Sequence, residues 1–204
     1  SKKVILEEFL EGEEVSYFLI VDINNFLFIG SAQDHKRVGE SETGPNTGGM
    51  GAYSPAPIIN ENLEKKIINR IVKPTLKALK AKNHPYTGFL YVGLMIKDNE
   101  PYLIEYNIRM GDPECQVIMP RLKTDLVELL YAAVENKLNK IKIKWSKDKC
   151  MTIVLCAKGY PNKYVNNKKI NLINVELTRK SFIFHAGTKI KNNLLFSNGG
   201  RVLN

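Results

Sequence analysis

Alternating polar side chains in one strand-like segment could bind a cation. The segment from Tyr102 to Glu114 carries Glu105, Asn107 and Arg109 at every second position. Residues two apart on a β-strand lie on the same face, and a carboxylate beside an amide oxygen suits Mg²⁺, which adds phosphate oxygens and water to its shell. Arg109 could bind a carboxylate or phosphate through two parallel N–H groups. By spacing alone, an ordinary half-exposed strand with its polar face in water accounts for the pattern better, and both interpretations stay open.

A long segment rich in glycine and proline could bind an anion. Residues 33–57 include the run from Thr43 to Pro55, which has glycine at four positions, and basic residues precede it at 36 and 37. Glycine lets backbone N–H groups come close to an anion, although no Gly-Lys-Ser/Thr of a Walker A loop is present. A solvated, turn-rich loop is the alternative. The length of the segment favours a binding role, because irregular loops this long are usually functional or disordered.

The acidic run from Glu7 to Glu14 follows the apolar residues Val4 to Leu6. Acidic side chains at the end of a strand could bind ribose hydroxyls, while the strand backbone could pair with the edge of an adenine. Acidic strand ends are also commonly just solvated, so this segment is a weak signal by itself.

Composition excludes several classes of protein. The chain has 204 residues, is 44% hydrophobic and 25% charged, and has a net charge of +9. No apolar run approaches the roughly 18–20 residues that span a bilayer, so we expect a cytoplasmic protein without a membrane partner. The lysines are spread over predicted helix faces and turns, and no nucleic-acid-binding motif accompanies them, so we expect no nucleic-acid partner. The three cysteines and three histidines lack the spacing of a zinc site.

Periodicity predicts strands, two helices and a β-rich end. We expect a buried first strand over Val4 to Leu10, a kinked helix that Asn60 caps and Pro74 interrupts, and a second helix from Thr124 to about Leu138. Two more predicted strands, Tyr17 to Val21 and Phe26 to Ile29, are joined by a hairpin. The remaining predicted strands are Gly88 to Ile96, Tyr102 to Ile108, Thr152 to Ala157, Ser181 to Ala186, Leu194 to Ser197 and Arg201 to Leu203.

Seven motifs, taken in order, resemble the glycinamide ribonucleotide synthetase (phosphoribosylamine–glycine ligase) family of the ATP-grasp superfamily. They are EEFLEGEE, AQDHKR, TGPNTGGMGAYSPAP, YTGFLYVGLMI and IEYNIRMGDPECQ, followed by FHAGT and NGGRVL. The resemblance covers nearly the whole chain and is least distinctive over residues 136–149 and 162–180. It implies an α+β fold: an ATP-grasp large subdomain, mostly antiparallel sheet with helices, over residues 1–145, and a small, truncated β-rich C-terminal domain over residues 146–204.

The resemblance also implies a reaction and its participants. Enzymes of this family use ATP to convert glycine to an acyl phosphate, which the amine of 5-phosphoribosylamine attacks to give glycinamide ribonucleotide in purine biosynthesis. It makes Glu105 and Asn107 the ligands of Mg²⁺ or Mn²⁺. The catalytic candidates are Arg109, Asp112 and Lys36. The residues implied to bind the nucleotide and other anions are Glu7, Glu8, Phe9, Leu10, Glu13, Asp34, Asn46, Gly48, Gly49 and Gly51.

The chain departs from the family pattern at its start and at one position in the RMGDPE motif. Nothing before Ser1 supplies the N-terminal domain or the small ATP-binding subdomain, and Cys115 stands where the family is expected to have threonine. The missing half lies on another chain, the sequence is a fragment, or the protein is a non-catalytic remnant with at most weak nucleotide binding. Nucleic-acid binding and a different ATP-grasp ligase are further alternatives, although other ligases of the superfamily lack TGPNTGGMGAYSP.

Overall fold

The computed structural model describes residues 4–172 and 177–204. Residues 1–3 and 173–176, which belong to the two predicted domains, lie outside the described residues. The described chain forms two compact units. Unit 1 contains the chain up to Ser31 together with Pro55–Met110 and Leu122–Trp145, and unit 2 contains Ala32–Ser54, Gly111–Arg121 and Ser146–Asn204.

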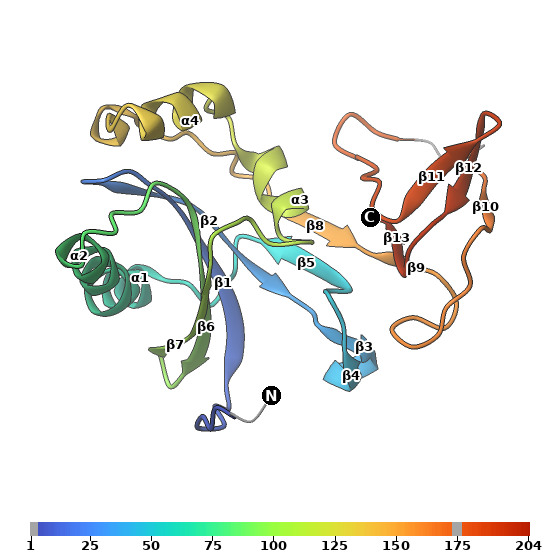
Figure 1. Cartoon of the computed structure of the whole chain (residues 1–204), viewed down its shortest axis with the longest axis horizontal. Helices are drawn as coiled ribbons and strands as arrows, with labels where there is room; N and C mark the ends of the chain where they lie inside the picture. The colour runs from blue at the N-terminus through green and yellow to red at the C-terminus, as the bar shows by residue number, and fades with distance from the viewer. Residues whose placement is uncertain (1–3, 173–176) are drawn as a thin grey trace. The chain divides into compact units, whose positions relative to one another are not determined.

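Unit 1 is built on an antiparallel sheet in the order β7-β6-β1-β2 (Figure 1). The strands are β1 (Glu13–Val21), β2 (Phe26–Asp34), β6 (Gly88–Lys97) and β7 (Glu100–Asn107). The predicted hairpin between β1 and β2 is confirmed, and Asp22 closes its turn by accepting hydrogen bonds from the backbone N–H groups of Asn24 and Asn25. The strands predicted over Gly88 to Ile96 and Tyr102 to Ile108 correspond to β6 and β7, which form a second hairpin: Asp98 and Asn99 have positive φ in its two-residue turn, as such hairpin turns require.

One face of this sheet carries the main hydrophobic core. Alternate residues of β1 and β6 are buried there, from Val15 and Tyr17 on β1 to Val92 and Leu94 on β6. The helical segment that covers this face consists of α1 (Glu61–Ile67), the π-helical turn η2 (Ile68–Val72) and α2 (Lys73–Ala81). Leu63 and Ile67 are completely buried against the strands. The apolar period of 3.6 in this segment therefore corresponds to its buried stripe.

The start and the interruption of this helical segment are both confirmed. The Asn60 side chain accepts a hydrogen bond from the N–H of Leu63 at 2.9 Å, as an N-cap residue does. Pro74 does not end the helix; instead, the preceding turn widens, and the N–H of Lys73 donates to the carbonyl of Ile68. A π-turn accommodates the proline, which has no N–H to donate to the preceding turn.

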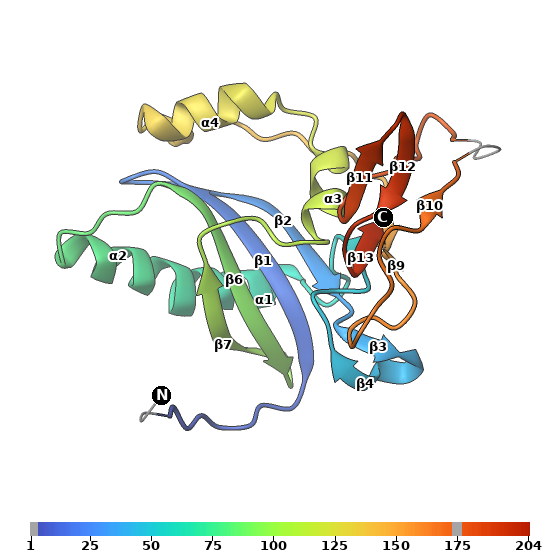
Figure 2. The same cartoon turned by 45° about the vertical axis from the view of Figure 1, so that its right-hand side comes forward.

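The opposite face of the same strands carries Phe18 and Tyr91, whose rings stack at 4.8 Å. Helix α4 (Leu126–Val134) lies on this side, while α1 and α2 lie on the other (Figures 1 and 2). The predicted helix from Thr124 to Leu138 is wrong at both ends. Asp125 caps it through the N–H groups of Val127 and Glu128, the helix ends at Val134, and a short 3-10 turn, η4 (Leu138–Lys140), follows.

Unit 2 consists of short strands and short helical turns. The end of β2 pairs with β5 (Gly51–Ser54), and β5 pairs with β8 (Cys150–Ile153). A small hairpin of β3 (Arg37–Gly39) and β4 (Thr43–Asn46) surrounds the turn η1 (Glu40–Glu42), and α3 (Cys115–Ile118) runs into η3 (Met119–Arg121). The remaining strands are β9 (Leu155–Cys156), β10 (Lys169–Ile170), β11 (Thr188–Lys191), β12 (Leu194–Ser197) and β13 (Arg201–Leu203).

Three further expectations about secondary structure are wrong. Val4 to Leu10 form no strand, and Val4, Ile5, Leu6 and Phe9 are 84–92% exposed, because no described strand pairs with this segment. Residues 33–57 are not one irregular loop, since they contain the end of β2, the β3–β4 hairpin and β5. Ser181 to Ala186 form no strand: His185 makes an isolated bridge to Leu203, flanked by backbone hydrogen bonds of Phe184 and Ala186, and the next strand lies further on, at β11.

The expected mixture of helices and antiparallel sheet is confirmed. Across the described residues, no helix has the length and apolar character needed to cross a bilayer. The boundary predicted between residues 145 and 146 stays a prediction.

Candidate functional site

In unit 1, Glu105 and Asn107 form an adjacent carboxylate–amide pair on β7. Asn107 Nδ2 donates to Glu105 Oε1 at 2.8 Å, so the predicted shared face is confirmed for these two side chains. Gly93 lies opposite Glu105 and Tyr91 opposite Asn107, which places the pair on the sheet face away from the main core. Glu105 is exposed and Asn107 is half-buried. The Glu105 side chain is therefore open to solvent, and metal binding by the pair stays a prediction.

The backbone of β6 and β7 makes room for this pair. The β6–β7 register shifts between Gly93 and Leu94, so that Ile104 is an extra residue on β7. A Cβ atom at Gly93 would lie 3.3 Å from Glu105 Cγ, which means that a glycine opposite Glu105 leaves space for its side chain. Ile104 is 44% exposed, whereas Tyr106 packs against the main core as alternation predicts.

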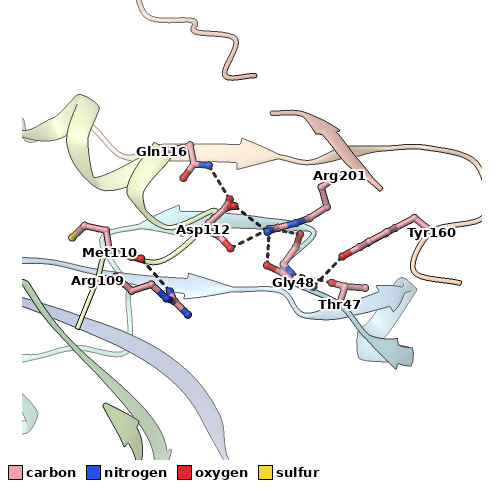
Figure 3. A network of polar contacts seen from close by, with 9 residues as sticks. Thr47, Gly48, Arg109, Met110, Asp112, Gln116, Tyr160 and Arg201 are labelled. Atoms are coloured by element: carbon pink, nitrogen blue, oxygen red, sulfur yellow. Dashed lines mark hydrogen bonds and ion pairs between the residues drawn. The ribbon is translucent and has the colours of Figure 1, made fainter. Parts of the chain in front are cut away.

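Arg109 lies just beyond the end of β7. Its Nη1 donates to the carbonyl of the next residue, Met110, at 3.1 Å, and the side chain is exposed (Figure 3). A single backbone hydrogen bond leaves most of the five guanidinium N–H donors available. The role of Arg109 as an anion ligand stays a prediction.

In unit 2, the turn that links β4 to β5 is held by its own backbone N–H groups. Thr47 and Met50 donate to the carbonyls of Lys36 and His35, at 2.7 and 2.8 Å. Gly48 donates to Tyr160 Oη at 3.1 Å, and Gly49 donates to Thr47 Oγ1 at 3.0 Å. These four N–H groups are engaged within the protein. The turn is therefore rigid and preorganised, and its binding of an anion stays a prediction.

The glycines of this turn allow close packing. Gly49 has φ +110°, and a Cβ atom there would collide with Pro113 Cδ and lie 2.7 Å from Asp34 Oδ1. A Cβ atom at Gly51 would lie 2.7 Å from the carbonyl of Thr152 on β8. Positive φ and such short approaches both require glycine. This packing brings Gly49 against Asp34, one of the predicted site residues.

Arg201, on β13, joins this turn to Asp112 (Figure 3). Its Nη1 donates to the carbonyls of Gly48 at 2.6 Å, Asp112 at 3.1 Å and Gly49 at 3.4 Å, and its Nη2 donates to Asp112 Oδ2 at 2.9 Å. The other carboxylate oxygen of Asp112 accepts from Gln116 Nε2 at 2.9 Å. Both oxygens of Asp112 are thus held by protein donors.

The residues that follow Asp112 are packed tightly. Gly111 has no room for a side chain, because a Cβ atom there would collide with the buried carboxylate of Glu114. Cys115 begins α3, and burial raises the pKa of its thiol, helped by the negative charges of Asp112 and Glu114. Burial likewise raises the pKa values of Cys150 and Cys156. Three free thiols with raised pKa values are poor nucleophiles at neutral pH.

The residues implied to bind the nucleotide are in open positions in unit 1. Glu7, Glu8 and Phe9 are exposed, Leu10 is half-buried, and Glu13 is the exposed first residue of β1. Only Glu13 belongs to a strand. The role of this segment in nucleotide binding stays a prediction.

The structure thus brings the predicted residues into two groups. Glu105 and Asn107 lie together in unit 1. In unit 2 the turn from Asn46 to Gly51 lies with Asp34, Lys36 and Asp112. Sequence reasoning missed Arg201, Tyr160 and Gln116, which hold the unit 2 group together. The motif NGGRVL pointed to the segment that contains Arg201, but the residues that Arg201 contacts are 89–153 positions away in the chain. In the described ranges, no group of three histidine, cysteine or acidic side chains is arranged to hold a metal ion.

Comparison with known proteins defines first the class and then the family. A family model of the phosphoribosylglycinamide synthetase ATP-grasp (A) domain matches residues 1–115, and a model of the C domain of that synthetase matches residues 150–204. The chain is therefore an ATP-grasp protein. Because the first model alone matches more than half of its residues, the chain belongs to the phosphoribosylglycinamide synthetase family.

Similar proteins and structures agree with this membership. A phosphoribosylamine–glycine ligase of Agrobacterium fabrum is 47% identical over 202 residues, which are 99% of this chain and 48% of the relative. A ligase of the same name from Vigna unguiculata is 50% identical over 206 residues, 98% of this chain and 66% of the relative. The crystal structure of the Thermotoga maritima phosphoribosylamine–glycine ligase has a TM-score of 0.79 at 37% identity and covers 97% of this chain and 48% of that chain. The chain spans about half the length of most of these relatives.

Proposed function

We propose that the protein containing this chain joins glycine to 5-phosphoribosylamine, with conversion of ATP to ADP and phosphate. The observation that carries the proposal is the pair of exposed Glu105 and half-buried Asn107, hydrogen-bonded at 2.8 Å, in a chain of the phosphoribosylglycinamide synthetase family. The names of the relatives supply the substrates, and the product is glycinamide ribonucleotide for purine biosynthesis in the cytoplasm. Since this chain spans about half of most of these relatives, turnover needs the half that they have in addition.

The proposed chemistry has two steps. An oxygen of the glycine carboxylate attacks the γ-phosphorus of ATP, ADP leaves, and glycyl phosphate forms. The amine of 5-phosphoribosylamine then attacks the acyl carbon, the C–O bond to phosphate breaks, and the amine loses a proton as the amide forms. No side chain has to become covalently attached, so the main task of the protein is to hold several anionic groups together and to neutralise them.

The donors on β7 fit a hard divalent cation. Glu105 and Asn107 would hold Mg²⁺ or Mn²⁺ through a carboxylate and an amide oxygen, the ligand types that such ions prefer. A cation bound there would neutralise the phosphate oxygens of ATP. The Asn107–Glu105 hydrogen bond occupies part of this donor set, so cation binding competes with it. Arg109, which keeps free N–H donors, binds an anionic oxygen of a substrate.

The unit 2 group serves the phosphate and acceptor side of the reaction. Lys36 supplies positive charge beside the rigid turn from Asn46 to Gly51, and Asp34 and Asp112 flank that turn. Because both oxygens of Asp112 accept protein hydrogen bonds, we assign Asp112 the role of holding its neighbours in place. We further propose that residues 1–145 form the ATP-grasp core, that residues 146–204 form the C-terminal domain, and that Glu7 to Leu10 and Glu13 contact the nucleotide.

The test measures phosphate release by the full-length protein that carries this sequence, with ATP and Mg²⁺. The proposal predicts release that needs both glycine and 5-phosphoribosylamine, the latter formed in the assay from ribose 5-phosphate and ammonia. Release that ignores glycine would contradict the substrate assignment. Binding of ATP without any turnover would support the alternative, a non-catalytic ATP-grasp remnant.

A further inference from the structure

Four acceptor atoms converge on one guanidinium group in unit 2. They are the carbonyl oxygens of Gly48, Gly49 and Asp112 and the carboxylate oxygen Oδ2 of Asp112, at 2.6 to 3.4 Å from Arg201 (Figure 3). Four acceptors around one point repel one another unless a cation with several donors lies between them. A planar guanidinium can serve them together: the two N–H groups of Nη1 are shared among the three carbonyls, and Nη2 donates to the carboxylate. A lysine ammonium is a compact point charge with three donors and cannot reproduce this arrangement.

The surroundings of Arg201 fix its position. Its side chain is 21% exposed, and a Cβ atom at Gly48 would lie 3.0 Å from Arg201 Cζ, so the guanidinium lies directly against the glycine backbone. Tyr160 Oη accepts a hydrogen bond from the N–H of Gly48, the residue whose carbonyl binds Arg201. Gly48 is therefore held at both its N–H and its carbonyl by residues of the C-terminal segment. Such a charge-assisted contact is stronger than a neutral hydrogen bond.

We propose that Arg201 is a positioning residue: it fixes the turn from Gly48 to Met50 and the Asp112 carboxylate in the conformation that the ligase reaction requires. The inference rests on the proposed function, because it assigns this turn and Asp112 to the phosphate and acceptor side of the site. Arg201 itself touches no reacting atom. It acts through the three carbonyls and the carboxylate that it binds, so that the C-terminal segment controls the geometry of the turn.

Two measurements on the full-length protein separate a positioning role from a general contribution to stability. The first is hydrogen exchange of the Gly48, Gly49 and Met50 amides, which needs no turnover. The second is the steady-state rate with glycine, 5-phosphoribosylamine and ATP. The variants are Arg201→Ala and Arg201→Lys, and the matched control is Arg179→Ala, which removes an exposed arginine of the same unit.

For Arg201→Ala we expect amide exchange of the turn to become about 10-fold faster, a change equivalent to about 1.4 kcal/mol in the free energy of local opening. We expect kcat to fall by about 100-fold, since small displacements of positioning groups have effects of this size, while KM for ATP stays unchanged. Arg201→Lys should recover little of the rate, and low millimolar guanidinium should partly restore Arg201→Ala. Arg179→Ala should match the wild type in both measurements.

Several results would overturn the proposal. Unchanged exchange in Arg201→Ala would mean that Arg201 does not hold the turn, and faster exchange with a normal kcat would mean that the reaction does not need the turn held. If Arg201→Ala does not fold, Arg201→Lys decides by the same criteria. If the wild-type protein shows no glycine-dependent turnover, the proposed function fails, and the exchange rates alone then support or overturn the holding role of Arg201.

Discussion

Substitution of Gly49 by alanine is the sharpest test of how the glycine turn in unit 2 is built. Gly49 has φ +110°, a conformation that residues with a Cβ atom rarely adopt. An added Cβ atom would also collide with Pro113 Cδ and approach Asp34 Oδ1 to 2.7 Å and the Asp112 carbonyl to 3.3 Å. Two of these contacts involve a proline ring and a backbone atom, which have little freedom to move away.

The two effects can be estimated separately. A non-glycine residue in a sparsely populated backbone region costs about 1–3 kcal/mol. Forcing an extra methyl group into a packed site costs roughly another 1–3 kcal/mol. We therefore expect Gly49→Ala to lower the free energy of unfolding by about 2–6 kcal/mol, a large part of the roughly 5–15 kcal/mol that a typical domain has.

Urea denaturation followed by circular dichroism measures this loss, with Gly48→Ala as the control. Gly48 is adjacent in the same turn, but its added Cβ atom would meet only the end of the Arg201 side chain, at 3.0 Å. The end of that long side chain can shift by a few tenths of an ångström and keep its hydrogen bonds, so we expect Gly48→Ala to cost about 1 kcal/mol or less. Equal losses for the two variants would refute the argument that the backbone conformation and packing of Gly49 require glycine.

Two further predictions concern unit 1. Burial, reinforced by Glu64, raises the pKa of Tyr17, whose hydroxyl donates to Glu64 Oε1 at 3.0 Å. Tyr17→Phe should lower the free energy of unfolding by about 1 kcal/mol at pH 7. Above pH 10 the phenol ionises in the unfolded chain before it does in the folded protein. The free energy of unfolding of the wild type should therefore fall by about 1.4 kcal/mol per pH unit relative to the variant, and the two proteins should be equally stable near pH 11. A stability difference that stays constant up to pH 12 would argue against this. Asn60→Ala should lower the stability by about 1 kcal/mol, because it removes the side chain that accepts a hydrogen bond from the Leu63 N–H. Asn60→Asp keeps an acceptor and should lower the stability little. Equal losses of stability for the two variants in thermal unfolding would count against the capping role of Asn60.

Local signals in the sequence were sufficient to predict much of unit 1. The turn after β1 is stabilised by Asp22 through residues two and three positions away, and the start of α1 by Asn60 through Leu63. Both interactions are encoded within one turn of chain. The alternation on β7 likewise placed Glu105 and Asn107 on one face, because a regular strand allows no other arrangement for residues two apart.

The errors in the predicted fold share a physical cause, since a strand exists only where another strand pairs with it. The segment from Val4 to Leu10 begins with three apolar residues and was predicted as a buried strand, but no described strand pairs with it, and Val4, Ile5, Leu6 and Phe9 are exposed. The segment from Ser181 to Ala186 was equally suitable by composition. It pairs with the C-terminal residues only over Phe184 to Ala186, too short a stretch to count as a strand, whereas β12 pairs with β11 over four residues.

The candidate site was predictable only in part, for the same reason. The residue types of the glycine turn indicated close packing, but the partners of that packing come from distant positions. Arg201 lies 89 residues from Asp112 and 153 from Gly48 in the chain, and Tyr160 lies 112 residues from Gly48. No local pattern identifies such contacts. They follow from the fold of unit 2 and become visible only once its strands are paired.

The central claim is that Glu105 and Asn107 hold a divalent cation that the ligase reaction needs. It is tested most directly by the Mg²⁺ dependence of glycine-dependent phosphate release in the full-length protein carrying Glu105→Gln, with Glu128→Gln, an exposed glutamate on α4, as control. The account predicts a rate at least about 100-fold lower for Glu105→Gln, because loss of a metal-ion ligand removes several kcal/mol of charge stabilisation. Glu105→Gln should also need a higher Mg²⁺ concentration and unfold at the same temperature as the wild type, and Glu128→Gln should match the wild type in rate and Mg²⁺ requirement. A Glu105→Gln protein with the wild-type rate and Mg²⁺ requirement would contradict it.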